Sequence, residues 1–460
     1  MPLPLRLALL CGIACLAMPL LADEAAPQPS PQPARKPNIL VVVGDDMGYA
    51  DVGVHGCKDI PTPHIDSLAT RGVRFSSGYV SGPYCSPTRA GLMTGRYQQR
   101  FGHEFNPGPP GEGNLHIGLP VDETTLADRL GEAGYICGMV GKWHLGHAPK
   151  FHPMARGFTS YFGFLGGAHG YFGEDRAKDH AANAILRGRE PVEEKAYLTD
   201  ALGREAVAFV TAHRAKPWFL YLTFNAVHTP MEAPKDRLER FAHIGDTRRR
   251  TYAAMMSAMD DALGSVLAKL RETGQDQDTL VFFVSDNGGP PSNGSRNHPL
   301  RGEKATTWEG GVRVPFLVQW PRAIPAGRVL PQPVIQLDIA ATALAAAGSP
   351  APTQARLDGV DLLPLLAGKT DAAPHPALYW RFGEQTAIRM GDYKLVQARG
   401  SGGQALYNLA SDISESKDLS ATMPDKLREM KDAYEAWNKQ LVAPNWGHPK
   451  VNAKKAKKKA

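Results

Sequence analysis

Residues 38–46 read Asn-Ile-Leu-Val-Val-Val-Gly-Asp-Asp and indicate the class of fold. The run from Asn38 to Val43 is continuous and almost wholly apolar, as is typical of a strand buried on both faces of a parallel sheet. It ends abruptly in Gly44, Asp45 and Asp46. The stretch therefore predicts a central strand with carboxylates directly after its end.

Three more apolar runs end in polar side chains in the same way. They are Leu280–Val284 before Asp286 and Asn287, Trp218–Phe224 before Asn225 and His228, and Tyr135–Val140 before Lys142 and His144. Helical patterns at 197–213 and 251–272 separate them. This alternation predicts an α/β fold, a mostly parallel sheet sandwiched by helices. Ligands bind at the carboxyl ends of strands in such sheets, so these polar residues are expected to line one site.

The pattern changes near residue 376. Short strands separated by glycines are expected at 379–382, 386–390, 393–396 and 406–407, followed by an amphipathic helix at 424–440. We therefore predict an α/β domain over 38–375, which contains the polar residues at the strand ends. A smaller C-terminal subdomain, an antiparallel sheet with one helix, is expected over 376–445.

The acidic residues after two of the runs offer oxygen ligands for a metal. Asp45 and Asp46 follow one run, and Asp286 and Asn287 follow another. An adjacent pair of acids is usually a solvated loop, but both pairs here follow buried strands. Oxygen ligands without sulfur suit Ca²⁺ or Mg²⁺ rather than Zn²⁺. The sequence thus predicts a site for a divalent cation.

Residues 85–96 read Cys-Ser-Pro-Thr-Arg-Ala-Gly-Leu-Met-Thr-Gly-Arg. This segment resembles the sulfatase family, in which the cysteine of a Cys-x-Pro-x-Arg motif is oxidised to Cα-formylglycine. Most of the family has serine where this chain has Thr88. The likeness covers roughly residues 36 to 442 and is closest to arylsulfatases of bacterial type. It continues through Gly141-Lys142-Trp143-His144-Leu145-Gly146, Asp286-Asn287-Gly288, Leu300-Arg301-Gly302-x-Lys304 and Tyr407-Asn408-Leu409.

The resemblance implies a metal site and a nucleophile. The cation, usually Ca²⁺ and alternatively Mg²⁺, would be held by Asp45, Asp46, Asp286, Asn287 and the modified Cys85. The hydrated aldehyde at Cys85 would attack sulfur, and elimination of sulfate would then regenerate the aldehyde. A formylglycine-generating enzyme is therefore an expected partner.

The resemblance also implies roles for the basic residues. Arg89 would steady the formylglycine, and Lys142 would contact both it and the sulfate. His144 would lie beside the formylglycine hydroxyl and remove its proton. His228 and Lys304 would face the bridging sulfate oxygen, and one of them would protonate the leaving alcohol. These cations and the metal make the expected pocket positive, as a sulfate ester requires.

The loops predicted to line the pocket are less informative. His169, in a glycine-rich segment, is a candidate for substrate binding, and the adjacent pair His103 and Glu104 is a weaker one. The sequence leaves open the natural substrate, the position of its sulfate, exo or endo action and the oligomeric state.

The two ends of the chain differ from its body. Residues 1–22 resemble an export signal, with Arg6 before an apolar stretch shorter than the about 20 residues of a membrane span. A proline-rich linker is expected at 23–37. The net charge of +6 is matched by six lysines in a tail at 446–460, which leaves the body neutral and argues against a nucleic-acid-binding core. We expect an exported protein, periplasmic or secreted, without a transmembrane segment in the mature chain.

Three cysteines remain after removal of the leader: Cys57, Cys85 and Cys137. An odd number in an exported protein leaves one without a partner in the same chain. The sequence leaves open whether Cys57 and Cys137 pair.

The leading hypothesis is a sulfuric ester hydrolase that acts on an extracellular sulfated glycan. One alternative is a phosphonate or phosphodiester hydrolase of the same superfamily, which would share the metal and the nucleophile. Another is a non-catalytic binder of sulfated glycans with an unmodified Cys85.

Overall fold

A computed structural model of the chain describes residues 1–2, 36–109, 111–173, 183–349 and 356–447. The chain divides into two compact units, Met1–Arg35 and Lys36–Ala460, and the second is described below. The expected leader, linker and lysine-rich tail lie largely outside the described residues. Within these residues, no helix combines the length and the hydropathy needed to cross a membrane.

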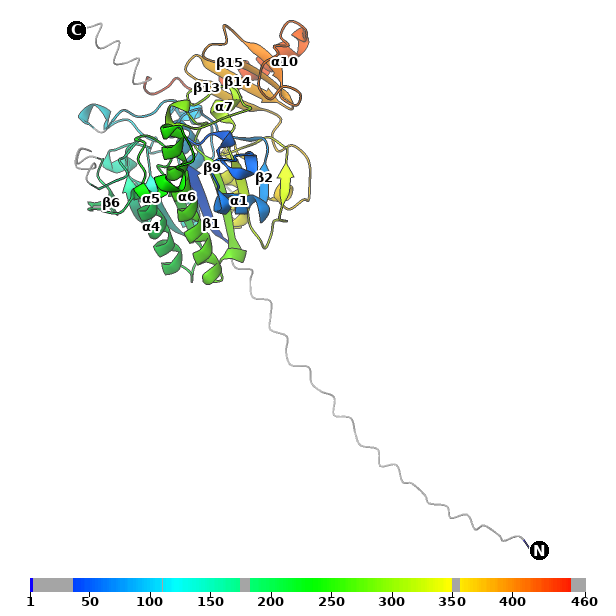
Figure 1. Ribbon diagram of the computed structural model, residues 1–460. Helices are drawn as coiled ribbons and strands as arrows, with labels where there is room; N and C mark the ends of the chain where they lie inside the picture. The colour runs from blue at the N-terminus through cyan, green and yellow to red at the C-terminus, as the bar shows by residue number, and fades with distance from the viewer. Residues whose placement is uncertain (3–35, 110, 174–182, 350–355, 448–460) are drawn as a thin grey trace. The chain divides into compact units, whose positions relative to one another are not determined.

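A ten-stranded sheet forms the centre of the second unit (Figure 1). In spatial order its strands are β11 (Arg328–Leu330), β2 (Val73–Phe75), β10 (Phe316–Gln319), β9 (Thr279–Ser285), β1 (Asn38–Gly44), β8 (Trp218–Thr223), β4 (Ile136–Lys142), β5 (Ser160–Phe164), β6 (Leu186–Arg187) and β7 (Glu190–Pro191). The five strands from β9 to β5 are parallel to one another. Strand β10 is antiparallel to both of its neighbours.

The register of the central strands aligns their carboxyl ends. Gly44 of β1 pairs with Ser285 of β9, and Val43 pairs with Thr223 of β8. Thr223 in turn pairs with Gly141 of β4. Residues that follow these strands therefore emerge at one edge of the sheet, as the sequence predicts.

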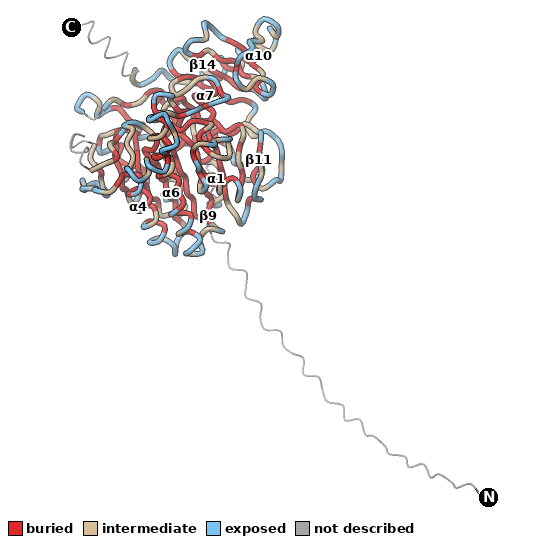
Figure 2. Tube along the Cα trace, viewed as in Figure 1, coloured by how far each residue is buried: buried red, intermediate tan, exposed pale blue. Residues whose placement is uncertain are grey.

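Helices cover both faces of the sheet. Helices α1 (Pro63–Thr70), α4 (Leu198–Ala212), α5 (Lys235–Arg240) and α6 (Thr247–Glu272) lie on one side, and α2 (Cys85–Thr94), α3 (Leu126–Glu132) and α8 (Asp338–Ala346) contribute to the core on the other. Alternate residues of β1 point to opposite faces: Leu40 and Val42 pack with α1, α4 and α6, while Val41 and Val43 pack with α2, α3 and α8. Buried residues accordingly run the length of the central strands (Figure 2).

The C-terminal part is a four-stranded antiparallel sheet with a helix. Its strands are β13 (Leu378–Phe382), β14 (Gln385–Met390), β15 (Tyr393–Gln397) and β16 (Ala405–Asn408), followed by α10 (Pro424–Asn438). Trp437 of α10 stacks on Tyr379 at a ring-centroid distance of 4.9 Å. Trp380 and Leu406 share a buried cluster with Tyr79 and Trp308 of the larger part. The two parts are therefore joined through a common apolar core.

Besides several 3-10 helices, the remaining strands and α-helices of the described residues are short. They are β3 (Gly78–Tyr79), which pairs with β12 (Val334–Ile335), and the helices α7 (Glu309–Val312) and α9 (Leu363–Leu366).

The expected fold class is confirmed, and most expected elements agree with the structure within a few residues. Helix α6 begins at Thr247, earlier than expected, because the carboxylate of Asp246 accepts hydrogen bonds from the backbone N–H groups of Arg248 and Arg249. Strands β5 and β10 were not expected. Gly163 interrupts the apolar pattern of β5, and β10 is only four residues long.

Candidate active site

Two pairs of polar side chains meet where β1 and β9 end. Asp45 and Asp46 follow β1, and Asp286 and Asn287 follow β9. All four are buried. Asp46 adopts a left-handed backbone with φ of 63°, which is uncommon outside glycine, asparagine and aspartate. Its N–H donates to Asp286 Oδ1 at 3.3 Å, and Asn287 Nδ2 donates to Asp46 Oδ1 at 2.7 Å, so the two loop ends are bound together.

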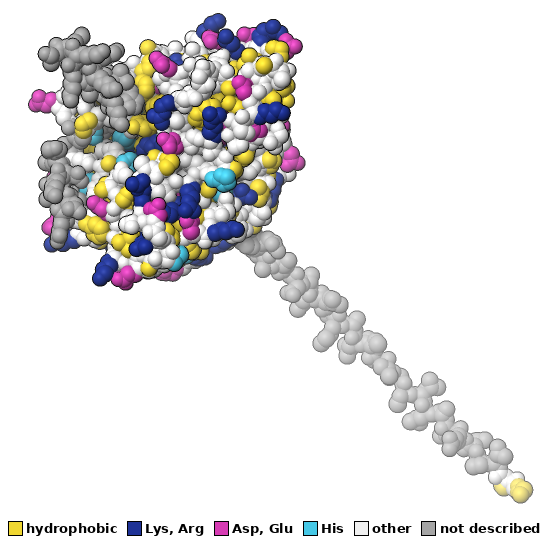
Figure 3. Space-filling model, turned by 45° about the horizontal axis from the view of Figure 1, so that its top comes forward, with side chains coloured by type: hydrophobic (Ala, Val, Ile, Leu, Met, Phe, Trp, Pro, Cys, Tyr) yellow, Lys and Arg dark blue, Asp and Glu magenta, His cyan; other side chains and the backbone are white. Residues whose placement is uncertain are grey.

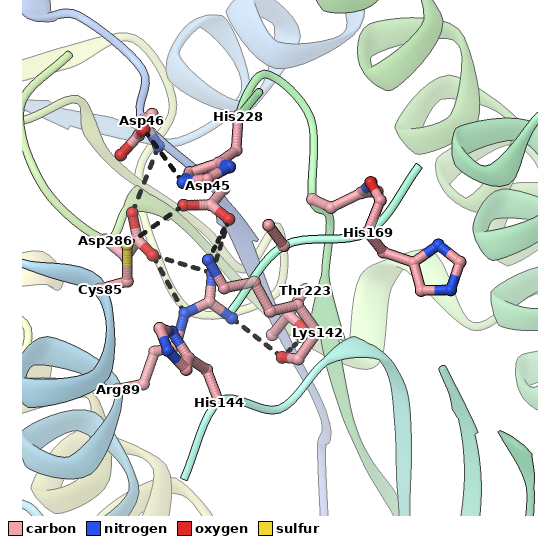
Figure 4. Close-up of polar contacts among 12 residues, drawn as sticks. Asp45, Asp46, Cys85, Arg89, Lys142, His144, His169, Thr223, His228 and Asp286 are labelled. Carbon is pink, nitrogen blue, oxygen red and sulfur yellow. Dashed lines mark hydrogen bonds and ion pairs between the residues drawn. The ribbon is translucent and has the colours of Figure 1, made fainter. Parts of the chain in front are cut away.

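Cys85 begins helix α2 and lies against this carboxylate cluster (Figure 4). Its thiol donates to Asp45 Oδ1 at 3.6 Å and accepts from Lys304 Nζ at 3.3 Å. Burial raises the pKa of the thiol to about 12, although Lys142 and Lys304 favour the thiolate. The unmodified side chain is therefore protonated, and a protonated thiol is a weak nucleophile.

Arg89, one turn further along α2, holds Asp286 in place. Its guanidinium donates to Asp286 Oδ2 through Nε at 3.0 Å and Nη2 at 2.8 Å, and its Nη1 donates to the carbonyl of Lys142 at 2.9 Å. Burial opposes the charge of Arg89, but the carboxylates of Asp286 and Asp45 raise its pKa. Arg89 thus links the cysteine-bearing helix to the ends of β9 and β4.

Two lysines face the same carboxylates. Lys142 forms a fully buried ion pair with Asp45, and Lys304 contacts Asp46 Oδ1 at 2.6 Å. Burial opposes the charge of Lys304, yet Asp46 raises the lysine's pKa well above its ordinary value. Burial likewise opposes ionisation of Asp46, but Lys304 and His228 hold that carboxyl's pKa at about 2. Both groups of this pair are ionised at neutral pH.

Asp286 differs from Asp46 in the direction of its pKa shift. Burial and the neighbouring Asp45 carboxylate raise its pKa to about 6, against the effect of Arg89. Three buried carboxylates in one cluster repel one another, and a divalent cation would relieve that repulsion.

The carboxylate and amide oxygens of this cluster fit a hard cation. The ligand atoms of Asp45, Asp46, Cys85 and His228 all lie within 4.8 Å of one another. Asn287 Oδ1 is buried and has no hydrogen-bond partner among the described residues. A buried amide oxygen without a partner is costly unless a ligand binds it, and amide and carboxylate oxygens are the ligands that Ca²⁺ takes.

Two histidines flank the cluster. His228 is partly exposed, and its Nε2 lies 3.6 Å from Asp46 Oδ2. Burial lowers the pKa of His228 to about 4, although Asp46 favours the charged imidazolium. His144 is buried, and burial together with Lys142 and Arg89 lowers its pKa well below the ordinary value. Its Nδ1 has no hydrogen-bond partner in the described part of the chain, so a neutral imidazole with an available nitrogen is present.

The weaker candidates lie in other surroundings. The ring of His169 points away from the carboxylates in Figure 4 and packs on Phe164 at a centroid distance of 5.0 Å. A substrate contact by His169 stays a prediction. Glu104 is buried and pairs with Arg381 at 2.9 Å.

Cys57 and Cys137 are both free, so no disulfide joins them. Cys57 packs against the core on the α6 side of the sheet, and Cys137 belongs to the core on the opposite side.

Several supporting residues carried no signal in the sequence. Ser86 Oγ donates to the carbonyl of His144 at 2.6 Å and lies 2.6 Å from Nε2 of the buried His103. Asn293 Nδ2 donates to the carbonyls of Asp46 at 3.2 Å and Val227 at 3.0 Å. Each joins segments that are far apart in the chain, and a motif search has no access to such contacts. His103 was a candidate for substrate binding. It is fully buried and contacts the Ser86 hydroxyl, and a substrate contact by His103 stays a prediction.

Comparison with known proteins agrees with this geometry. A family model described as Sulfatase matches residues 37–349, and one described as N-sulphoglucosamine sulphohydrolase, C-terminal, matches residues 302–440. N-acetylgalactosamine-6-sulfatase of Canis lupus familiaris is 37% identical over 81% of this chain and 73% of its own length. Steryl-sulfatase of Mus musculus is 32% identical over 82% of this chain and 72% of its own length.

A solved structure is similar over nearly the whole chain. The crystal structure of Ps i-CgsB in complex with k-i-k-neocarrahexaose superposes with a TM-score of 0.86 at 39% sequence identity, covering 91% of this chain and 96% of that chain. Together with the arrangement around Cys85, these matches define the class: the chain belongs to the sulfatase family. It is a sulfuric ester hydrolase, as expected from the sequence, and the alternative of a non-catalytic binder is not retained.

Proposed function

We propose that this sulfatase removes sulfate from a sulfated glycan outside the cytoplasm, with Cys85 converted to formylglycine and Ca²⁺ bound beside it. The observation that carries the proposal is the position of the Cys85 sulfur, between Asp45 Oδ1 at 3.6 Å and Lys304 Nζ at 3.3 Å. A nucleophile at this position has carboxylate oxygens that can bind a metal on one side. On the other side it has the Lys304 ammonium, which can bind the sulfate group.

The proposed metal ligands are Asp45, Asp46, Asp286 and Asn287, joined by the modified Cys85. Their oxygen chemistry and the unpartnered Asn287 Oδ1 support Ca²⁺, with Mg²⁺ as the alternative. A bound divalent cation supplies positive charge and orients the nucleophile. Arg89 keeps the Asp286 carboxylate turned toward the cluster through two hydrogen bonds.

The case for formylglycine rests on the thiol itself. A thiol whose pKa burial raises to about 12 is scarcely ionised at neutral pH. The hydrated aldehyde supplies a hydroxyl nucleophile and a second hydroxyl through which sulfate can be eliminated. A maturation enzyme must act on Cys85 before the chain folds, because the folded chain buries this side chain.

The basic residues then have distinct roles. Lys142 and Lys304 neutralise the sulfate monoanion, and both stay close to the carboxylates that hold them in place. A bound sulfate would raise the pKa of His228 from about 4 toward neutrality, because an anion favours the imidazolium. His228, or Lys304 beside it, then donates a proton to the leaving alcohol. The neutral His144 accepts the proton during elimination.

The choice of substrate rests on the relatives. Two of the similar proteins are connected with carbohydrates. One is named N-acetylgalactosamine-6-sulfatase, and the other, Ps i-CgsB, was solved in complex with k-i-k-neocarrahexaose. The leader-like segment at residues 1–22 supports an exported enzyme that meets extracellular polysaccharide. On the face seen in Figure 3, basic and acidic side chains are interspersed. The positive charge proposed for the site comes from the buried Lys142 and Arg89 and the partly buried Lys304.

The proposal is tested by measuring released inorganic sulfate. The mature enzyme would be incubated with sulfated carrageenan oligosaccharides, sulfated N-acetylgalactosamine, a steryl sulfate and an aryl phosphonate ester. We expect release from at least one carbohydrate with a higher kcat/KM than from the steryl sulfate. Faster hydrolysis of the phosphonate ester than of every sulfate would instead favour the phosphonate or phosphodiester hydrolase alternative.

A further inference from the structure

Lys304 reaches the site from an irregular loop, residues 301–308, that does not directly follow a strand of the large sheet. Asp45, Asp286 and Lys142 are fixed by the register of β1, β9 and β4. The ammonium of Lys304 is nevertheless held within 3.3 Å of Cys85 Sγ and 2.6 Å of Asp46 Oδ1. Some other part of the molecule must therefore hold the loop.

The C-terminal part supplies contacts along this loop, from β15 and from the segment between β16 and α10. Thr307 Oγ1 donates to the carbonyl of Gln397 at 3.3 Å. Arg301 Nη1 donates to the carbonyl of Glu415 at 2.8 Å, and Glu415 Oε2 accepts from the N–H of Glu309 at 2.8 Å. These contacts hold the two ends of the loop, leaving the residues next to Lys304 to be held by other groups.

Gln385, at the start of β14, holds Ala305, the residue that follows Lys304. Its Nε2 donates to the carbonyl of Ala305 at 2.9 Å, and its Oε1 accepts from the N–H of Arg399 at 2.9 Å. Both partners are backbone groups of fixed polarity, so the amide has one orientation that satisfies both. On the other side, the N–H of Ala305 donates to the carbonyl of Pro83, two residues before Cys85.

Ala305 needs this support because its backbone is in the left-handed region, with φ of 65°. Alanine there is less stable than in the right-handed or extended region by roughly 1–2 kcal/mol. The hydrogen bonds to Pro83 and from Gln385 fix this conformation from both sides. The conformation in turn sets the direction in which Lys304 leaves the loop.

We infer that Gln385 is a positioning residue for Lys304, and that the C-terminal sheet thereby sets the distance between this ammonium and the nucleophile at residue 85. Gln385 acts through the Ala305 carbonyl and makes no contact with the reacting atoms. The inference rests on the proposed role of Lys304 at the bridging sulfate oxygen.

The test compares two substitutions that remove the donated hydrogen bond. Gln385→Met has a similar length and makes neither bond. Gln385→Glu can still accept from Arg399 but places a carboxylate oxygen against the Ala305 carbonyl. For both variants we expect kcat on an unactivated carbohydrate sulfate to fall by about tenfold to a hundredfold, because small displacements of a catalytic group have effects of this size. With an activated aryl sulfate the loss should be several times smaller.

The matched control is Glu384→Gln, an exposed position directly beside Gln385 in the same hairpin. It should leave kcat unchanged on both substrates. Peptide mass spectrometry across Cys85 should give the same extent of modification in all variants, since Gln385 lies outside the maturation motif. This step separates misplacement of Lys304 from incomplete maturation.

A double-mutant cycle with Lys304→Ala completes the test. Gln385→Met should have no further effect on kcat in the Lys304→Ala background. It should also weaken binding of inorganic sulfate, measured by calorimetry, only when Lys304 is present. Equal effects of Gln385→Met in both backgrounds, or no effect in either, would overturn the inference. If Lys304→Ala itself leaves turnover of both substrates unchanged, the proposed role of Lys304 fails instead.

Discussion

Residue 85 is surrounded by charges from four separate parts of the chain. Asp45 follows β1, Asp286 follows β9, Lys142 ends β4 and Lys304 lies on a loop supported by the C-terminal sheet. Neither lysine is free to move independently, because each is paired with a buried carboxylate. The positive and negative groups are therefore held in fixed positions, as the proposed binding of a sulfate monoanion and a cation requires.

Cys85→Ala should abolish turnover and leave the fold intact. The substitution removes the proposed nucleophile but little core volume, so the free energy of unfolding should change by about 1 kcal/mol or less. Sulfate release and thermal unfolding of the purified variant provide the two readouts. Residual turnover above the uncatalysed rate would show that another group attacks sulfur.

His228→Ala should slow substrates with poor leaving groups more than activated aryl sulfates. An aryl oxide of low pKa leaves without a proton, whereas a sugar alkoxide requires one, and general acids typically contribute about 10²–10⁴-fold. The measurement is kcat/KM across a series of leaving groups. Equal losses on all members of the series would contradict the role of His228 as proton donor.

Removal of the divalent cation should lower both stability and activity. Asp45, Asp46 and Asp286 repel one another when they are ionised without it, and saturation at a hundred times Kd would stabilise the fold by about 2.7 kcal/mol. Thermal unfolding with chelator and with added Ca²⁺ should differ accordingly. Asp46→Asn should raise the Ca²⁺ concentration needed for the shift. Identical melting curves and activities with and without chelator would contradict the metal site.

The residues of the site were predictable where a motif contained them or, for Asp45, Asp46, Asp286 and Asn287, where they directly follow a buried strand. Cys85, Arg89 and Lys142 lie in segments that resemble a known family, and the structure brings them together. Gln385, Asn293 and Ser86 were not predictable as supporting residues, because their importance comes from contacts with segments remote in sequence. The sequence shows the reacting groups more readily than the groups that hold them.

At the level of single elements, the alignment of strand ends builds the site. Gly141 shows how closely β4 and β8 approach just before Lys142. Its φ is 114°, and a Cβ placed on it would lie 1.8 Å from the Thr223 carbonyl oxygen. Only glycine fits this approach.

Gly141→Ala should therefore lower the free energy of unfolding by about 3 kcal/mol and displace Lys142, since the added methyl group meets backbone rather than a flexible side chain. Gly391→Ala is the control, because Gly391 also has positive φ but its Cβ would meet open space. That control should cost only about 1 kcal/mol. Denaturant unfolding of both variants separates steric clash from backbone strain, and equal losses would contradict the account of Gly141.

Long, uniformly apolar strands were the elements easiest to predict. β1, β8 and β9 are buried on both faces and bounded by polar residues, so their composition alone identifies them. Strands β5 and β10 escaped prediction because a glycine interrupts one and the other is very short. The antiparallel pairing of β10 depends on long-range contacts that no local pattern encodes.

At the scale of the second compact unit, the large and small sheets are joined by a buried ionic cluster as well as by apolar packing. Lys394 of β15 lies 2.9 Å from both Glu309 and Glu415. Burial raises the pKa of Glu415 from 4.5 to about 7, against the effect of Lys394. Burial opposes ionisation of Glu309 too, but Lys394 and Arg313 hold its pKa at about 2.

This cluster predicts a pH dependence of stability. A carboxyl whose pKa is higher in the folded than in the unfolded state binds its proton more tightly when the chain is folded. For Glu415 the resulting stabilisation is complete below the unfolded-state pKa of 4.5 and is lost as pH rises through about 7. Glu415→Gln cannot ionise, so the stability of the wild type relative to this variant should decline between pH 4.5 and pH 8. Thermal unfolding of both proteins across this range is the measurement. A relative stability that stays constant across this range would show that Glu415 is ionised throughout and would contradict its raised pKa.

The central claim is that residue 85 acts as a formylglycine in the mature enzyme. Peptide mass spectrometry across Cys85, on protein produced with its maturation system, tests it most directly. We predict a peptide about 18 Da lighter than the form that carries the thiol, because an aldehyde oxygen replaces the sulfhydryl group. An intact thiol in fully active protein from a competent host would contradict the claim.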